Sequence, residues 1–242
     1  MKSRFLWRAF RNRFRDNRTE LNVLRKHIQP NDIVCDIGAN KGSYTFWLSK
    51  WASNGKVIAF EPQKTLADYL KQATNALKLN NVVVEEKAVS AISGKACLFI
   101  PGGSVSPGAS LSNAVSDREN CCKETVDVVT LDEYFPSNQR VSALKIDVEG
   151  SELDVFKGAM RILKESNPLL VFECENRHLT QGSVNDVFEF LIPLGYRGYF
   201  VFQNSLVNIK QFNSQLHQRQ TGSRYWDEKD YVNNFVFLKG QS

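Results

Sequence analysis

The chain has 242 residues, which is long for one domain and short for two, and its hydrophobic fraction of 42% and charged fraction of 24% are close to globular averages. This composition excludes a disordered, collagen-like or membrane-embedded protein. The net charge of +5 comes from residues 1–18, which carry seven Lys or Arg and one Asp, so the remaining chain is nearly neutral and gives no sign of a nucleic-acid-binding core.

Residues 1–28 are predicted to form a basic amphipathic arm ahead of a single domain at residues 29–242. In the arm, Phe5, Leu6, Trp7, Phe10 and Phe14 alternate with arginines at helical spacing. We expect a helix that covers one side of the core and leaves a basic face in solvent. Contact with an acidic membrane surface is the alternative, and nucleic acid is a less favoured partner.

The cysteines and the apolar runs bear on the compartment. The five cysteines are an odd number and show no C-x-x-C spacing, which favours free thiols in a reducing, cytoplasmic compartment. No apolar stretch approaches the roughly 20 residues that span a bilayer, and the N-terminal residues do not have the pattern of a signal peptide. We therefore expect a cytoplasmic protein, and the sequence does not indicate its oligomeric state.

After Pro30 the sequence alternates between short apolar runs and helical stretches, a pattern typical of βαβ units and a parallel sheet. A Gly-, Ser- and Asn-rich loop is predicted at residues 101–123, and a strand resumes at Val126. A helix is predicted at 184–194, and an antiparallel pair at the sheet edge at 199–202 and 235–238. The buried parallel strands are predicted at residues 32–36, 56–60, 82–86, 143–146 and 169–172.

The first candidate site is the sequence VCDIGANKG at residues 34–42, which follows a strand and opens a helix. Gly38 and Gly42, with Asn40 between them, allow a sharp turn and close approach of a ligand to the backbone. Asp36 ends the strand, where it can accept hydrogen bonds or pair with a cation. The spacing D-x-G-x-x-x-G does not match G-x-G-x-x-G, so the turn favours a cationic ligand without phosphate, such as S-adenosylmethionine.

Glu61 ends the next strand and is the second candidate. A carboxylate at this position can accept hydrogen bonds from both hydroxyls of a ribose, as in dinucleotide sites. Because the carboxyl ends of adjacent parallel strands meet at one edge of the sheet, Glu61 and Asp36 should share one site. By the same topology, Ala88 and Val89 after the third strand should flank an adenine.

Acidic residues also follow the fourth and fifth strands: Asp147, Glu149 and Glu152 after the fourth, and Glu173, Glu175 and His178 after the fifth. Such a cluster could hold a divalent cation or supply a general base for a hydroxyl group. The spacing is diagnostic of no metal site, so we expect no metal and favour the base. Glu152 could instead simply stabilise the N-terminus of the following helix, which we expect Ser151 and Asp154 to cap.

The segments DIGANKG, FEP, KIDVEGSE and VFKGA, with P-x-x-x-FE at residues 168–173, together resemble the FkbM family of S-adenosylmethionine-dependent methyltransferases. The resemblance covers residues 32–237, and KIDVEGSE is its most specific segment. It implies an α/β, Rossmann-like class I methyltransferase fold, with helices on both faces of a mostly parallel seven-stranded sheet that has an antiparallel edge strand. It also implies methyl transfer, usually to an oxygen of a sugar, glycolipid or natural product.

We therefore expect Asp147 to contact the cofactor close to the transferred methyl group, and His178 or Glu173 to accept a proton from a small-molecule or glycan hydroxyl. Two other functions are open. One is a nicotinamide-dependent Rossmann oxidoreductase, which the glycine spacing disfavours. The other is a non-enzymatic binding module that uses the basic arm, which the intact set of Asp36, the glycines and Glu61 disfavours.

Overall fold

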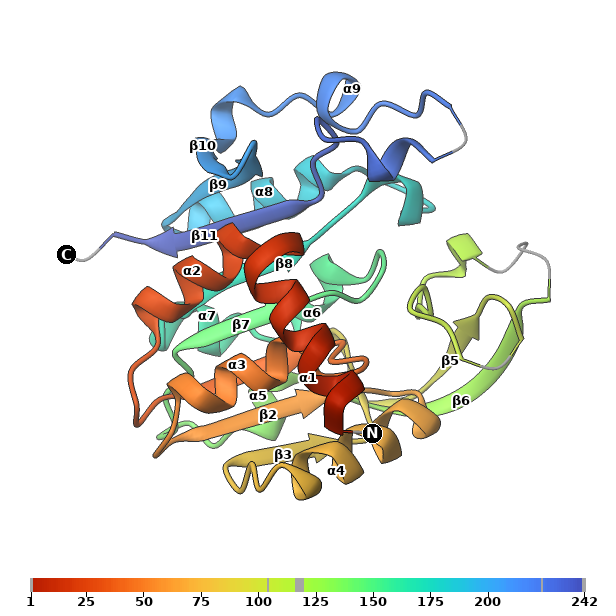
Figure 1. Ribbon diagram of the computed structural model, residues 1–242. Coiled ribbons are helices and arrows are strands. Elements are labelled where there is room, and N and C mark those ends of the chain that lie inside the picture. The colour runs from red at the N-terminus through yellow and green to blue at the C-terminus, as the bar shows by residue number, and fades with distance from the viewer. Residues whose placement is uncertain (1, 104, 116–119, 223, 241–242) are drawn as a thin grey trace.

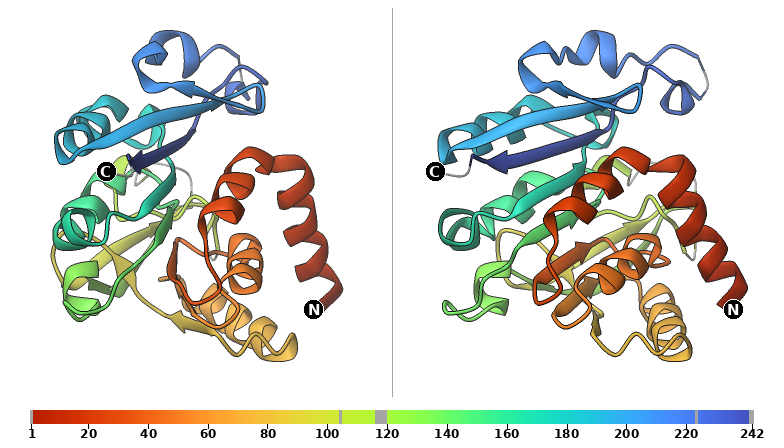
Figure 2. Two further views of the ribbon diagram at one scale, coloured as in Figure 1. Left: turned by 90° about the vertical axis from the view of Figure 1, so that its left-hand side faces the viewer. Right: turned by 60° about the vertical axis from the view of Figure 1, so that its left-hand side comes forward.

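A computed structural model of the chain describes residues 2–103, 105–115, 120–222 and 224–240. An eight-stranded sheet crosses the molecule and carries helices on both faces (Figures 1 and 2), in the strand order β10-β9-β11-β8-β7-β1-β2-β3. This is the α/β fold that the sequence predicts, with one strand more than the expected seven. The strands are β1 (Ile33–Ile37), β2 (Lys56–Phe60), β3 (Val82–Glu85), β7 (Ala143–Ile146), β8 (Leu169–Glu173), β9 (Tyr196–Phe202), β10 (Ser205–Asn208) and β11 (Asn234–Lys239).

The five strands from β8 to β3 are parallel. Two of the predicted strands, at residues 56–60 and 143–146, match β2 and β7 to the residue, and the other three differ by at most one residue at either end. Apart from the edge strand β3, which is only partly buried, their apolar composition reflects burial on both faces, as is usual for parallel sheets. Alternate side chains enter different cores: Val34 lies in the core on one face, and Cys35 in the core on the other.

The predicted antiparallel pair is confirmed, because β11 pairs with β9 in antiparallel register. However, β11 lies between β8 and β9 instead of at the edge, and the outermost strand is β10. A two-residue turn joins β9 to β10, and both turn residues, Gln203 and Asn204, have positive φ, as tight hairpin turns require. The antiparallel edge strand is thus β10, which the sequence analysis did not identify.

One face of the sheet is covered by the N-terminal helices. Phe5 and Ala9 of the first helix pack beside Leu70 of the fourth, and Leu21 and Leu24 of the second pack beside Leu48 of the third. Residues of the predicted arm therefore form part of the core in this structure. The elements on this face are α1 (Lys2–Arg11), the π-helical turn η1 (Asn12–Asp16), α2 (Arg18–His27), α3 (Ser43–Trp51) and α4 (Lys64–Ala76).

The opposite face is covered by α5 (Leu131–Tyr134), α6 (Glu152–Lys157), α7 (Met160–Glu165) and α8 (Val184–Leu191). The helix expected to begin near Glu152 is divided into α6 and α7, which are separated by Gly158 and Ala159. The expected capping of α6 was wrong, because Ser151 occupies the N-cap position without a side-chain cap hydrogen bond. The nearby backbone N–H of Gly150 instead donates to Glu152 Oε1 (3.1 Å).

A separate three-stranded sheet extends from the carboxyl end of β3 (Figure 1). It consists of β4 (Ala88–Val89), β5 (Gly94–Ile100) and β6 (Cys122–Val129), and the predicted loop connects β5 to β6. Residues 104 and 116–119 of that loop lie outside the described residues. The sequence analysis missed β5, although its residues 96–100 form a short apolar run, and placed the start of β6 too late, because the first four residues of β6 are exposed.

The described residues also contain several short helical elements besides the helices named above. Within the described residues, no helix is long and apolar enough to cross a membrane. The five cysteines are all free thiols, as expected. The remaining elements are α9 (Ser214–His217) and the 3-10 turns η2 (Asn113–Val115), η3 (Asn176–His178), η4 (Ile192–Leu194), η5 (Ile209–Gln211) and η6 (Tyr225–Asp227).

Candidate functional site

A turn of residues 38–42 follows β1 and lies against the loop after β7. Gly38 has a φ of +73°, and a Cβ at this position would lie 1.8 Å from the backbone oxygen of Asp147. A glycine is therefore required both by the backbone conformation and by the contact between the two loops. The turn is also tied to β2, because the N–H groups of Gly38 and Ala39 both donate to the carbonyl oxygen of Phe60 (3.0 Å each).

Glu61, the residue after β2, faces the same turn. Its side chain is buried, and its two oxygens accept separate backbone hydrogen bonds, Oε2 from Asn40 N–H (2.8 Å) and Oε1 from Gln63 N–H (2.9 Å). These bonds fix the carboxylate, and each oxygen keeps a further lone pair. Burial raises the pKa of Glu61 to about 7, against the opposing effect of the two hydrogen bonds.

A pocket opens beside this carboxylate and contains about 560 Å³ of empty space, including the open solvent at its mouth. The loop between β5 and β6 covers one side of it, since Gln63 and Ser106 exchange two hydrogen bonds (2.8 and 3.0 Å). Six predicted cofactor-binding residues line the pocket: Gly38, Asn40, Glu61, Ala88, Val89 and Asp147. They come from the ends of four different strands, as the topology of a parallel sheet requires.

The other two predicted cofactor residues lie away from the pocket wall. Asp36 is fully buried and accepts a hydrogen bond from Thr45 Oγ1 (2.6 Å). A Cβ on Gly42 would lie 2.4 Å from Leu70 Cδ1 and 2.9 Å from Phe5 Cε2, so this glycine allows α1 and α4 to pack closely against the turn. Both residues support the turn from behind, and neither is among the residues that line the pocket.

The cation that pairs with Asp36 is supplied by the protein. Lys145 lies opposite Asp36 in the register of β1 and β7, and its Nζ lies 3.5 Å from Asp36 Oδ1 and 3.5 Å from Asp147 Oδ2. The same Nζ donates to the carbonyl oxygen of Gly38 (3.2 Å). Burial opposes the charge of Lys145, but Asp147, Asp36 and Glu173 together raise its pKa. The sequence analysis missed this residue, although a lysine within the otherwise apolar run ALKI was a visible signal.

Asp147 and Glu173 lie side by side at the carboxyl ends of β7 and β8, because Ile146 and Phe172 pair immediately before them. Glu173 Oε1 accepts a hydrogen bond from Asn233 Nδ2 (2.7 Å). Burial, followed by the charges of Asp147, Glu149 and Glu175, raises the pKa of Glu173 well above its usual value. A carboxyl group with a raised pKa is a suitable proton acceptor near neutral pH.

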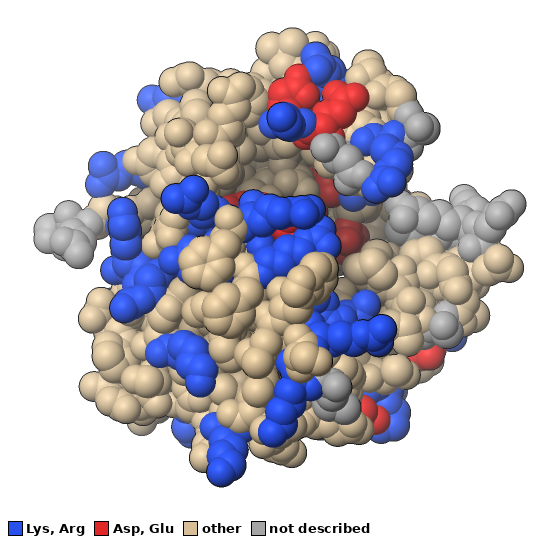
Figure 3. Space-filling model, in the orientation of Figure 1, with Lys and Arg blue, Asp and Glu red and all other residues tan. Residues whose placement is uncertain are grey.

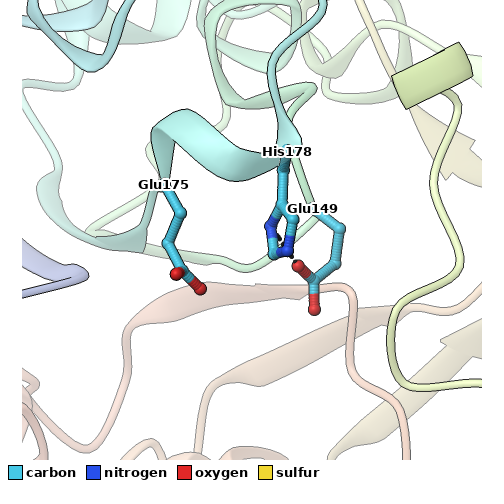
Figure 4. A group of neighbouring side chains, drawn as sticks. All are labelled: Glu149, Glu175 and His178. Atoms are coloured by element: carbon cyan, nitrogen blue, oxygen red, sulfur yellow. Dashed lines mark ion pairs between the residues drawn. The ribbon is translucent and has the colours of Figure 1, made fainter. Parts of the chain in front are cut away.

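His178 lies in η3, and its ring is almost fully buried. Its Nδ1 lies 2.5 Å from Glu149 Oε2, the ion pair marked in Figure 4. The two loops are held together by close backbone contact, since a Cβ on Gly150, which has a φ of +99°, would lie 2.2 Å from the backbone oxygen of His178. His178 and Glu173 do not line the pocket, so the structure places them beside it, toward β8.

Glu175 completes a group with Glu149 and His178, in which one donor atom from each residue lies within 4.8 Å of the others (Figure 4). Oxygen and imidazole donors at this separation can hold a divalent cation. However, both oxygens of Glu175 already accept hydrogen bonds from Arg177 (2.6 and 2.7 Å), and Oε2 also accepts one from Tyr231 (2.6 Å). The geometry of the group is therefore that of an ion-pair network.

The C-terminal segment closes this side of the site. Trp226 lies under the Arg177 guanidinium, whose Cζ is 5.0 Å from the indole centroid, and Tyr225 packs on Tyr231 with ring centroids 5.7 Å apart. Figure 3 shows acidic side chains inside a hollow between the C-terminal part of the molecule and the N-terminal helices. The arrangement can hold a ribose-bearing ligand in the pocket and a second, polar molecule beside it.

Comparison with known proteins gives a consistent result. The sequence model described as "Methyltransferase FkbM domain" matches residues 36–199. Hexuronic acid methyltransferase AglP of Haloferax volcanii is 27% identical over 66% of this chain and 64% of its own length. Methyltransferase sdnD of Sordaria araneosa is 29% identical over 54% of this chain and 62% of its own length. In both cases the match spans less than two thirds of the relative.

Solved structures support the fold. A methyltransferase FkbM from Methylobacillus flagellatus KT has a TM-score of 0.56 and 15% identity, and the match covers 87% of this chain and 44% of that chain. A precorrin-6y C5,15-methyltransferase from Geobacter metallireducens GS-15 has a TM-score of 0.51 and 15% identity, with coverage of 93% and 87%. At these identities the likeness concerns the fold, and it bears out the predicted Rossmann-like class I architecture.

Proposed function

Because the chain belongs to the FkbM family of methyltransferases, we propose that it transfers a methyl group from S-adenosylmethionine to a hydroxyl group of a sugar, a glycolipid or another small natural product. The observation that carries this proposal is the buried Glu61 carboxylate, which two backbone N–H groups hold at the wall of the pocket. A relative that acts on a hexuronic acid supports a sugar-like acceptor.

The residues of the pocket fit this cofactor. Glu61 would accept hydrogen bonds from the two ribose hydroxyls, for which its oxygens keep lone pairs. Ala88 and Val89, both buried and apolar, would pack on the adenine. Asp147 would face the amino acid part of the cofactor, in a loop that approaches the turn closely because Gly38 has no side chain. Bound S-adenosylmethionine supplies an electrophilic methyl group on a sulfonium.

The acceptor would be bound next to Asp147, on the side of β8. We assign Glu173 as the group that accepts the hydroxyl proton, because it is adjacent to Asp147, half-buried, and raised in pKa. His178 is the second candidate. Its pairing with Glu149 and its burial favour a positioning role in which it holds the loop after β7.

Calorimetric titration with S-adenosylhomocysteine and with NAD tests the cofactor. We expect binding of the first and none of the second, since the turn does not have the dinucleotide glycine spacing. Binding of NAD alone would support the oxidoreductase alternative and refute the proposal.

Transfer of a labelled methyl group to sugar, glycolipid and natural-product fractions tests the reaction. Glu173→Gln should lower turnover by about 10²- to 10⁴-fold, the usual contribution of a general base, and should leave the affinity for S-adenosylhomocysteine unchanged. Glu165→Gln, at an exposed position of α7, is the matched control. Full turnover in Glu173→Gln, together with its loss in His178→Gln, would assign the base to His178.

A further inference from the structure

The outer face of α1 and η1 exposes a row of aromatic side chains. Trp7, Phe10 and Phe14 are 61%, 47% and 64% exposed, and their spacing of three and four residues places them along one face of the helix. They are three of the nine large apolar residues exposed in the described part of the chain, although they come from eight consecutive positions. Isolated exposed apolar side chains are normal, but a contiguous row marks an interaction surface.

Arginines flank this row. Arg4, Arg11 and Arg15 are exposed, and the exposed Asp16 is the acidic residue of this segment. Figure 3 shows that Lys and Arg side chains gather over the face that carries α1, α2 and α3, with few acidic side chains among them. The rest of the chain is nearly neutral, so the positive charge of the protein belongs to this face.

The inner face of the same helix is fixed to the domain. Phe5 and Ala9 are fully buried, and Trp47 Nε1 of α3 donates to the carbonyl oxygen of Ala9 (2.7 Å). The exposed row is therefore held at the surface of the folded protein. It does not depend on a helix that must form upon binding, so little ordering entropy opposes an interaction.

We propose that this face, defined by Trp7, Phe10, Phe14 and the flanking Arg4, Arg11 and Arg15, binds the surface of an anionic lipid bilayer. Arginines attract anionic headgroups, and aromatic rings on an amphipathic helix enter the boundary between headgroups and acyl chains. The helix lies along the surface of the domain, which suits binding in the plane of the interface.

The ring contacts favour a bilayer over single-stranded nucleic acid. Nucleic-acid bases stack on open aromatic faces. Here Phe10 has ring contacts with Phe14, Phe46 and Trp47 at 5.9, 6.3 and 5.1 Å between centroids, and the Arg11 guanidinium lies 5.4 Å from the centroid of Trp7. The exposed edges of these rings can enter a lipid interface without separating from their neighbours.

Flotation of the full chain with vesicles tests the proposal. We expect binding to vesicles that contain phosphatidylserine, weak binding to pure phosphatidylcholine, and loss of binding when the salt concentration rises to several times the physiological value. The double variant Trp7→Ser, Phe14→Ser should reduce the partition coefficient at least tenfold. Each of Arg4→Gln, Arg11→Gln and Arg15→Gln should reduce it about fivefold.

The matched controls are Ile92→Ser, at a side chain that is 79% exposed elsewhere, and Lys164→Gln, at an exposed position of α7. They should bind vesicles like the unchanged protein, and all variants should keep its melting temperature. Equal binding to charged and neutral vesicles, or full binding by the Trp7 and Phe14 double variant, would overturn the proposal. The proposal would also be overturned if the protein bound a single-stranded oligonucleotide through the same residues and did not bind vesicles.

Discussion

The role of Glu61 can be tested through a change of one atom. Glu61→Gln replaces a carboxylate oxygen by an NH₂ group, which would face the backbone N–H of either Asn40 or Gln63, each now 2.8 or 2.9 Å from an oxygen. One of these N–H groups would lose its hydrogen-bond acceptor. The ribose hydroxyls would donate to a neutral amide instead of a charged carboxylate. Hydrogen bonds to charged groups contribute about 1.5–3 kcal/mol, so the affinity for S-adenosylhomocysteine should fall roughly 10- to 150-fold.

The pKa of Glu61 adds a pH dependence whose sign follows from the binding geometry. Ribose hydroxyls donate to the ionised carboxylate, so binding favours the ionised form and releases a proton where the free protein holds one. With a pKa of about 7, the ionised fraction of Glu61 falls about tenfold from pH 8 to pH 6. The affinity should therefore fall about tenfold over this interval, and it should stay constant in Glu61→Gln.

Calorimetric titration in two buffers of different ionisation enthalpy measures both the affinity and the protons released, which should be about half a proton at pH 7. Glu86→Gln is the matched control, because Glu86 follows β3 but does not line the pocket. An affinity of Glu61→Gln within twofold of the unchanged protein would refute the assignment of Glu61. An unchanged affinity of the natural protein between pH 6 and 8 would refute the reasoning from its pKa.

Three further predictions concern the buried charges. Lys145→Met leaves Asp36 and Asp147 without their shared cation and should lower the free energy of unfolding by about 3–5 kcal/mol. An unchanged midpoint of urea unfolding would contradict the ion pairs of Lys145 with these two residues. Burial raises the pKa of Glu20 to about 7 from 4.5, so the folded state binds its proton more tightly and stability falls as pH rises through this window. Glu20→Gln should remove that fall in the free energy of unfolding, which amounts to at most about 3 kcal/mol. If the free energy of unfolding changed equally with pH in both proteins between about pH 4.5 and 7, this contribution of Glu20 would be excluded. Chelation by EDTA should leave methyl transfer unchanged, because Arg177 already compensates Glu175, and loss of activity restored by a divalent cation would show a metal site at that group.

The parallel part of the fold could be predicted from the sequence because its strands are buried on both faces and appear as continuous apolar runs. The start of β6 in the three-stranded sheet could not, since its first four residues are all exposed, and polar residues such as Lys123 and Glu124 resemble a loop. The edge strand β10 is short and mostly exposed, and its turn uses Gln203 and Asn204 in place of the usual glycine.

Most of the candidate pocket could also be predicted, because the ends of parallel strands meet at one edge regardless of packing details. The sequence alone could not predict which residues the side chains of the site contact in the folded protein. Asp36 faces Lys145 through the strand register, and Gly42 faces Phe5 of a helix almost 40 positions earlier in the chain. Those contacts arise in the folded state and have no local signal in the sequence, so the sequence could not predict that Asp36 and Gly42 lie behind the turn and do not line the pocket.

The buried charges of the site suggest why Lys145 matters beyond stability. Acidic groups outnumber the cations Lys145 and Arg177 at the carboxyl ends of β7 and β8, and burial, followed by this excess of acids, raises the pKa of both Glu149 and Glu173. Lys145 Nζ lies 3.5 Å from Asp36 Oδ1 and 3.5 Å from Asp147 Oδ2, so its charge sits between these two side chains, whereas the pKa of Glu173 is raised. Neighbouring carboxyl groups at one sheet edge can then take different roles, one toward the cofactor and one toward the acceptor proton. The acids at these two strand ends are Asp147, Glu149, Glu173 and Glu175, while Asp36 of β1 lies opposite Lys145.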